Sequence, residues 1–162
     1  PGPMRISTPR CNGPWTPAVT AADDSLNAAA RECLGRLFDL FPTGASPATA
    51  DIPWERGVIV GFHGDKTGHF RLDFYGGAHG DLIARWVGGP VEAVDGNDVA
   101  GELANILCCH VLPNLFTARA LFRVESPRAH NAPPTEGAAP LAVTRVAMPT
   151  GWIEARVMVD PA

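Results

Sequence analysis

Residues 96–112 of this 162-residue chain, GNDVAGELANILCCHVL, predict a helix that is apolar around most of its circumference. At about 100° per residue, large aliphatic side chains form one flank, and alanine, glycine and cysteine form the other. An ordinary amphipathic helix gives roughly half of its surface to water. Because this helix has so little polar surface, it has to be packed closely on the rest of the fold along most of its length.

The polar side chains of this predicted helix lie on one narrow line. With helical spacing, four of them fall within an arc of about 60°: Asp98, Glu102, Asn105 and Cys109. A line of this kind is either a seam that happens to face solvent or a site presented to a partner.

The composition is that of one soluble globular domain, with a hydrophobic share of 46% and a charged share of 19%. The net charge is −4 and Lys66 is the only lysine, with no basic run interleaved with aromatic residues. Nucleic acid is therefore not an expected partner.

No apolar stretch approaches the roughly 20 residues of a membrane span, and no secretory segment lies near the start, so we expect no membrane partner and a cytoplasmic location.

The four cysteines, at positions 11, 33, 108 and 109, include no CxxC pair, and we expect them to be reduced and mostly packed. The run Cys108-Cys109-His110 raises the question of a metal site with a distant ligand: His63, His69 or Cys33. Consecutive helical residues point about 100° apart, so the three cannot converge on one ion. We predict no metal site.

The first half of the chain predicts a flexible arm, a helix and a β-hairpin. Residues 1–22 are rich in proline, glycine, threonine and alanine, and Asp23–Ser25 then offer N-cap chemistry. Apolar residues recur at helical spacing over 26–41. Two strands follow, at 56–63 and 68–75, with Phe70, Leu72 and Phe74 on one face and His69, Arg71 and Asp73 on the other.

The turn between these strands, Gly64-Asp65-Lys66-Thr67-Gly68, loosely resembles a phosphate-binding loop. It lacks the Walker spacing and joins two strands instead of leading into a helix. We interpret it as a hairpin turn.

The second half predicts further helices and strands: a short helix at 80–87, the helix at 96–112 ended by Pro113, a strand at 118–125, an exposed loop at 126–139, and a hairpin of strands at 141–147 and 152–159. Because helices and strands are segregated along the chain, we predict an α+β fold, a single domain over 23–162. Its sheet is mainly antiparallel, with the helices packed on one face.

The chemistry available to the polar line depends on Glu102 and Asn105. An amide has no pKa in the working range, so Asn105 cannot be a general base, but it can orient a water molecule by hydrogen bonding. Glutamine has this role in GTPases. Glu102 can pair with a lysine of a partner. The pair therefore forms half of an active site, and a partner would supply the rest.

The pattern Asp98-x3-Glu102-x2-Asn105, within NDVAGELANIL, resembles the signature helix of the CheC/CheX/FliY family of chemotaxis phosphatases, and is most like CheX. In that family a proline follows further along the chain, and Pro127, in RVESPR, stands at or within one residue of that place. The order of the predicted elements over about 24–159 is similar to that of CheX.

This resemblance implies an activity, a partner and roles for the site residues. The family hydrolyses the aspartyl phosphate of phosphorylated CheY-like receiver domains. By motif, Asn105 would position the attacking water, Glu102 would dock the receiver's lysine, and Asp98 and Pro127 would support the site. The Mg²⁺ would belong to the receiver, so no cofactor of its own is implied. Relatives of the CheX type are commonly homodimers.

Two departures from the family pattern qualify these expectations. Relatives usually carry a glycine where this chain has Cys109, on the presented line, which keeps open a non-catalytic binding or adaptor module for a receiver, motor or signalling component. A dimerisation or scaffold domain without a receiver partner is a third reading. The first helix has Glu32 but Gly35 at the asparagine position, so only one site is expected.

Overall fold

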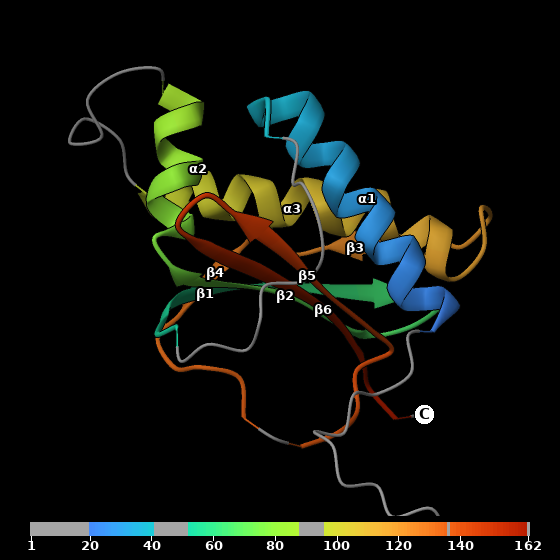
Figure 1. Cartoon of the computed structure of the whole chain (residues 1–162). Helices are drawn as coiled ribbons and strands as arrows, with labels where there is room; N and C mark the ends of the chain where they lie inside the picture. The colour runs from blue at the N-terminus through green and yellow to red at the C-terminus, as the bar shows by residue number, and fades with distance from the viewer. Residues whose placement is uncertain (1–19, 41–51, 88–95, 136, 162) are drawn as a thin grey trace, which may run out of the picture.

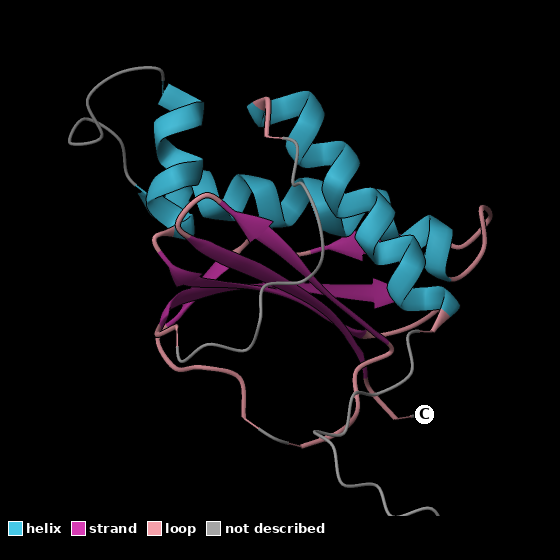
Figure 2. Ribbon diagram, viewed as in Figure 1, coloured by secondary structure: helices cyan, strands magenta, loops and turns pink. Residues whose placement is uncertain are grey.

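The computed structural model describes residues 20–40, 52–87, 96–135 and 137–161. Three helices cover one face of a six-stranded sheet whose described pairings are all antiparallel (Figures 1 and 2). The strand order is β3-β1-β2-β6-β5, and β4 also pairs with β1. The elements are α1 (Ala21–Phe38), β1 (Trp54–Gly64), β2 (Gly68–Gly76), α2 (Ala78–Val87), α3 (Gly96–Leu115), β3 (Phe122–Val124), β4 (Arg128–His130), β5 (Ala142–Met148) and β6 (Gly151–Val159). The predicted α+β fold with an antiparallel sheet is confirmed.

Helix α1 begins earlier than the sequence predicted. Thr20 is the N-cap, and its hydroxyl accepts from the Asp23 N–H at 3.1 Å while the Asp23 carboxylate accepts from the Thr20 N–H at 2.9 Å. The expected cap within Asp23–Ser25 is therefore wrong, because Asp23 serves as the third helical residue of a capping box. The predicted arm overlaps this cap and first turn at 20–22, and its remaining residues, 1–19, lie outside the described part.

Asp23 also ties the helical layer to the sheet. Its second carboxylate oxygen accepts from the Val143 N–H of β5 at 2.7 Å. Burial alone would raise the pKa of Asp23, but the hydrogen bonds from Thr20 and Val143 outweigh it and lower that pKa below its usual value.

Helix α1 ends at Phe38, with Asp39 in the left-handed region at φ 52°. The predicted end at Phe41 was too late, because the chain has already turned at the cap; residues 41–51 lie outside the described part.

The hairpin of β1 and β2 forms as predicted and carries the centre of the core. Phe70, Leu72 and Phe74 are fully buried beneath the helices. Their neighbours Arg71 and Asp73 point to the opposite face, as expected, yet they are buried too, at 8% and 0% exposure. The connection between β4 and β5 passes along that side of the sheet (Figure 1), and the Ala132 carbonyl accepts from the Arg71 guanidinium at 2.6 Å.

Three expectations for the second half were wrong. Helix α3 does not stop at Pro113 but continues to Leu115. The expected strand at 118–125 is only Phe122–Val124, and the expected loop at 126–139 contains β4, which pairs with β1 beside Gly57–Ile59. None of the helices in the described part is long and apolar enough to cross a membrane.

Candidate functional site on helix α3

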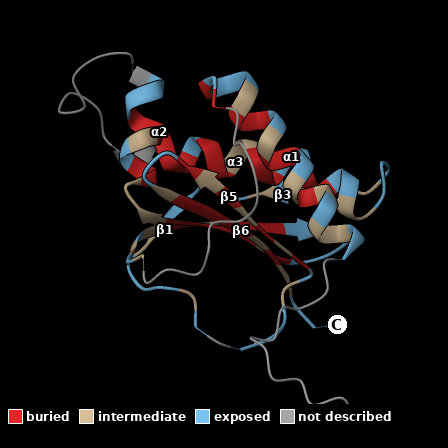
Figure 3. Cartoon of the chain, in the orientation of Figure 1, coloured by how far each residue is buried: buried red, intermediate tan, exposed pale blue. Residues whose placement is uncertain are grey.

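Helix α3 is buried on most of its surface, as its sequence requires (Figure 3). It packs on the sheet beside α1, and eight of its side chains are at most 2% exposed: Val99, Ala100, Leu103, Ala104, Leu107, Cys108, Val111 and Leu112. Glu102 and Cys109 are exposed and Asn105 is half-buried, so the structure brings these three together on one outward strip. The side chain of Asp98 lies outside the described part.

The two polar groups of the strip are not engaged by any other residue that the structure describes. Within the described residues, the Glu102 carboxylate makes no ion pair and the Asn105 amide makes no hydrogen bond. Because the helix beneath them is held by the core, both groups are presented on a rigid support instead of a loop.

Pro127 packs against α3 directly beside this strip. A Cβ built on Gly101 would lie 3.2 Å from the Pro127 Cβ, so the proline ring occupies the space that a side chain at 101 would need. Gly101 precedes Glu102 and lies one turn before Asn105, which places Pro127 on the Asn105 side of the strip. The family pattern associated Pro127 with this helix, and the structure shows that Pro127 and the helix are in contact at Gly101.

Replacing Gly101 by alanine tests this contact against a matched glycine. Gly80, in α2, has no atom within 4 Å of the position that a Cβ would take, so Gly80→Ala should raise the free energy of unfolding by about 0.5–1 kcal/mol through helix propensity. Gly101→Ala should gain clearly less, because its methyl group presses on Pro127. Urea unfolding of both variants measures the difference, and an equal gain at the two positions would contradict a tight Pro127 contact.

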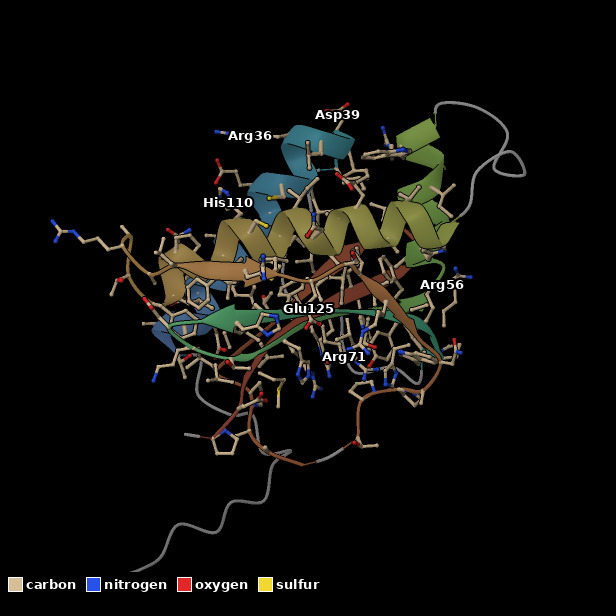
Figure 4. All side chains as sticks on the ribbon, turned by 180° about the vertical axis from the view of Figure 1, so that it is seen from behind. Arg36, Asp39, Arg56, Arg71, His110 and Glu125 are labelled. Carbon is tan, nitrogen blue, oxygen red and sulfur yellow. The ribbon has the colours of Figure 1, made fainter. Side chains whose placement is uncertain are left out.

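On the side that faces α1, the strip lies beside His110 and the charged residues Glu32 and Arg36. His110 Nε2 lies 3.5 Å from the Glu32 carboxylate, which also pairs with Arg36 at 2.8 Å. Figure 4 shows His110 and Arg36 close together in the helical layer. The Glu32–Arg36 pair could have been found from its i, i+4 spacing, but nothing in the sequence joins Glu32 to His110.

The sequence around α3 is poor in positive charge. No lysine or arginine occurs between Arg85 and Arg119, a stretch that contains four acidic residues: Glu92, Asp95, Asp98 and Glu102. A partner that presents a lysine or another cation to Glu102 therefore meets no fixed positive charge from this helix.

Cys109 extends the strip by two turns beyond Glu102 but is not a nucleophile. Burial raises the pKa of its thiol, and burial raises the pKa of the Cys108 thiol to about 12. Both are therefore protonated near neutral pH and lack the thiolate that nucleophilic chemistry needs. Within the described residues, no group of three or more His, Cys, Asp and Glu side chains is placed to hold a metal.

Comparison with known proteins identifies the fold of the chain. No protein-family model matches the chain, and no curated protein matches it by sequence. Among solved structures, a chemotaxis protein CheX from Desulfovibrio desulfuricans superposes with a TM-score of 0.67 at 13% identity, covering 87% of this chain and 100% of that one. The chain has the fold of CheX.

Two further structures agree with that assignment. CheX from Vibrio vulnificus gives a TM-score of 0.64 at 15% identity, covering 87% of this chain and all of the other. CheX in a complex with CheY, BeF3 and Mg²⁺ from Borrelia burgdorferi gives 0.63 at 15% identity, over 85% and 97% of the two chains. The resemblance to CheX that the motif and element order predicted is thus confirmed for the fold.

Proposed function

We propose that this protein is a phosphatase of the CheX type, which hydrolyses the aspartyl phosphate of a CheY-like receiver domain. Asn105 holds the attacking water through its amide, and Glu102 accepts a hydrogen bond from a lysine of the receiver. The receiver supplies the phosphoryl group and its Mg²⁺, and this chain contributes no metal. Asp98 and Pro127 support the start and the flank of α3.

The observation that carries this proposal is the state of the α3 strip. A carboxylate and an amide stand one turn apart on a buried helix, without partners among the described residues. Exposed polar groups on helices are common, but here Glu102 and Asn105 stand side by side on a helix whose neighbouring positions, from Val99 to Cys108, are mostly buried. The CheX fold, and the CheX–CheY complex among the structures that share it, support a receiver as the partner.

Phosphate release tests the activity directly. A receiver encoded near this gene, phosphorylated with a small-molecule donor, should lose its phosphate faster when this protein is added in catalytic amounts. A rate equal to that of the receiver alone, across the available receivers, would contradict the phosphatase proposal.

Glu102→Ala should weaken receiver binding by about tenfold, the expected loss of one hydrogen bond between charged groups. The proposed role of Glu102 is docking, so the apparent affinity should fall more than the rate at saturating receiver. Titration against a receiver loaded with beryllofluoride measures the affinity. Asp24→Ala is the matched control, because it removes an exposed carboxylate from α1 without touching the strip. Equal affinities of the Glu102→Ala variant and the wild type would rule out the docking role.

Cys109 favours a second candidate function, a receiver-binding module without catalysis. Its exposed side chain stands on the same strip, one turn beyond Asn105, where it can hold the receiver away from the amide. Binding of the loaded receiver without faster phosphate release would identify this function. Faster release in Cys109→Gly than in the wild type would show that the thiol is the obstacle.

We also propose a homodimer, from the resemblance to CheX. Strand β5 is an edge of the sheet, and only its Val143 N–H is covered by the Asp23 carboxylate among the described contacts. An edge with open backbone groups is suited to pairing with another chain. Light scattering should give twice the 17.1 kDa chain mass, and a monomer at micromolar concentration would contradict the proposal.

A further inference from the structure

The chain between β3 and β4 forms a bulge against β1. The pairing of β3 with β1 ends at Val124, and the pairing of β4 with β1 begins at Arg128. The three residues 125–127 therefore stand opposite only two residues of β1, at positions 60 and 61. One extra residue bends an edge strand and redirects a side chain, and such bulges are frequent beside functional sites. The last residue of this bulge is Pro127, which packs on α3.

Glu125 fastens the bulge to β1 on the sheet face away from the helices. Its N–H donates to the Gly61 carbonyl at 2.8 Å, and its carboxylate lies 3.3 Å from His63 Nε2. Val60 and Phe62 are fully buried in the core, so Gly61 and His63 between and after them face the other way. A Cβ built on Gly61 would overlap the Glu125 carboxylate. The carboxylate thus fills the space that a side chain at position 61 would take (Figure 4).

Pro127 meets α3 beside the Asn105 amide. The Pro127 Cβ lies 3.2 Å from the position of a Cβ on Gly101, one turn before Asn105. Helical side chains lean toward the N-terminus, over the turn that precedes their own Cα, so the Asn105 side chain extends toward Gly101. Asn105 is half-buried, whereas Glu102 is exposed. The proline ring therefore bounds the space that is open to the Asn105 amide.

We infer that Glu125 is a positioning residue of the α3 site, an inference whose effect on catalysis rests on the proposed role of Asn105. The Glu125 carboxylate, lying over Gly61 and against His63, holds the bulge in one position. Pro127, two residues further along, is thereby kept against α3 and confines the Asn105 amide to a narrow range of directions. Since reaction rates depend steeply on the alignment of the reacting atoms, a small shift of this amide lowers the rate. Glu125 lies on the far face of the sheet from α3, so it acts through Pro127 and not on the water itself.

Phosphate release by three variants tests this inference. Glu125→Ala removes the carboxylate, and Gly61→Ala displaces it, because the new methyl group takes its place and the end of a glutamate side chain can move aside. Each should lower the rate at saturating receiver about tenfold and leave KM for the receiver within about twofold. The double variant should lose no more than either single variant, because both changes remove the same contact. Glu125→Gln keeps the size and an acceptor for the His63 ring N–H, so it should keep at least about half of the rate.

Glu55→Ala is the matched control. Glu55 is an exposed glutamate near the start of β1 that also lies beside a histidine, with its Oε1 4.0 Å from His79 Nδ1. It is far along the strand from the bulge, so its loss should leave the rate within about twofold of the wild type.

A second measurement needs no activity. In the ¹⁵N-labelled full chain without receiver, the side-chain NH₂ resonances of Asn105 are assigned by their absence in Asn105→Ala. They should shift in Glu125→Ala and in Gly61→Ala, and should stay in place in Glu125→Gln and Glu55→Ala. A role of Glu125 in stability alone would lower the midpoint of thermal unfolding and leave these resonances unchanged.

The two measurements distinguish a failure of this inference from a failure of the proposed function. Unshifted Asn105 resonances in Glu125→Ala would overturn the inference, and so would an unchanged rate of that variant beside an active wild type. Equal losses in Glu125→Gln and Glu125→Ala would also overturn it, because the hydrogen-bonded side chain would then not be what holds the bulge. A wild type that does not accelerate phosphate release contradicts the phosphatase function, and the Asn105 resonances then still decide whether Glu125 positions the amide.

Discussion

Replacing Asn105 by alanine should lower the rate of phosphate release from a phosphorylated receiver by about 100-fold or more. The expected size is that of removing one preorganised hydrogen-bonding group from a reaction centre. Of the described groups of the strip, the ionised Glu102 carboxylate can only accept and the Cys109 thiol is a weak donor and acceptor, so the amide is the one strong group that can both donate to and accept from a water molecule. Without it, the water has no fixed direction of approach to the phosphorus atom.

The loss should not come from unfolding. The Asn105 amide has no hydrogen bond to the described residues, so its removal leaves no buried group unsatisfied. Alanine is also a better helix former than asparagine. The midpoint of thermal unfolding should therefore stay equal or rise slightly while activity disappears, which separates a catalytic role from a structural one.

Two further variants sharpen the result. Asn105→Asp keeps the shape of the side chain but loses the N–H donors, so it should be as inactive as Asn105→Ala. Asn114→Ala is the matched control: Asn114 is an exposed asparagine of the same helix whose amide donates to the His110 carbonyl at 3.1 Å, away from the strip. Its rate should stay within about twofold of the wild type. Equal phosphate release by wild type and Asn105→Ala would show that the catalytic role is wrong.

The sequence predicted those parts of the fold that periodicity determines. The alternation of Phe70, Leu72 and Phe74 predicted the central strand and its buried face, and the narrow polar line predicted which side of α3 meets solvent. Both follow from local spacing alone. The helix end at Pro113 was misjudged because a proline in the last turn loses one hydrogen bond but still permits helical φ angles.

Features created by contacts between distant segments could not be predicted in the same way. Strand β4 has three residues beside Pro127, too few to show alternation, and it exists because β1 offers a free edge to Arg128–His130. Of the candidate site, helical spacing put Glu102 and Asn105 on one polar line, and the resemblance to the family assigned roles to them and to Pro127; these roles stay predictions. The pairing of His110 with Glu32 depends on how α1 lies beside α3, which no local pattern specifies.

The burial of Arg71 and Asp73 leads to the largest effect that we expect on stability. Alternation placed both residues on the outer face, where charged side chains are usually solvated. The structure instead encloses the pair: the Asp73 carboxylate lies over Gly57, where a Cβ would come within 2.7 Å of its Oδ1, and it accepts from the Trp54 indole at 2.8 Å. The absence of a side chain at Gly57 makes room for this carboxylate.

Asp73→Ala should therefore cost about 3–5 kcal/mol of unfolding free energy, because it leaves a buried guanidinium without its counter-charge. Urea unfolding followed by circular dichroism measures the loss. Glu32→Ala, which breaks the exposed Glu32–Arg36 pair, should cost at most about 1 kcal/mol.

Asp73→Ala measures the penalty of leaving one buried charge unpaired. The double variant Arg71→Met/Asp73→Leu removes both charges, so it measures what the intact pair contributes to the free energy of unfolding. Removing both charges and filling their volume should recover most of the loss, because a buried ion pair contributes little beyond an apolar pair of the same size. The indole N–H of Trp54 would still lose its acceptor, so recovery should be incomplete by about 1–3 kcal/mol. A cost below about 1 kcal/mol for Asp73→Ala would mean that water reaches Arg71. In that case water solvates the Arg71 guanidinium once the Asp73 carboxylate is removed. The Arg71–Asp73 pair then does not hold the β4–β5 connection, which Arg71 contacts at the Ala132 carbonyl, against the sheet.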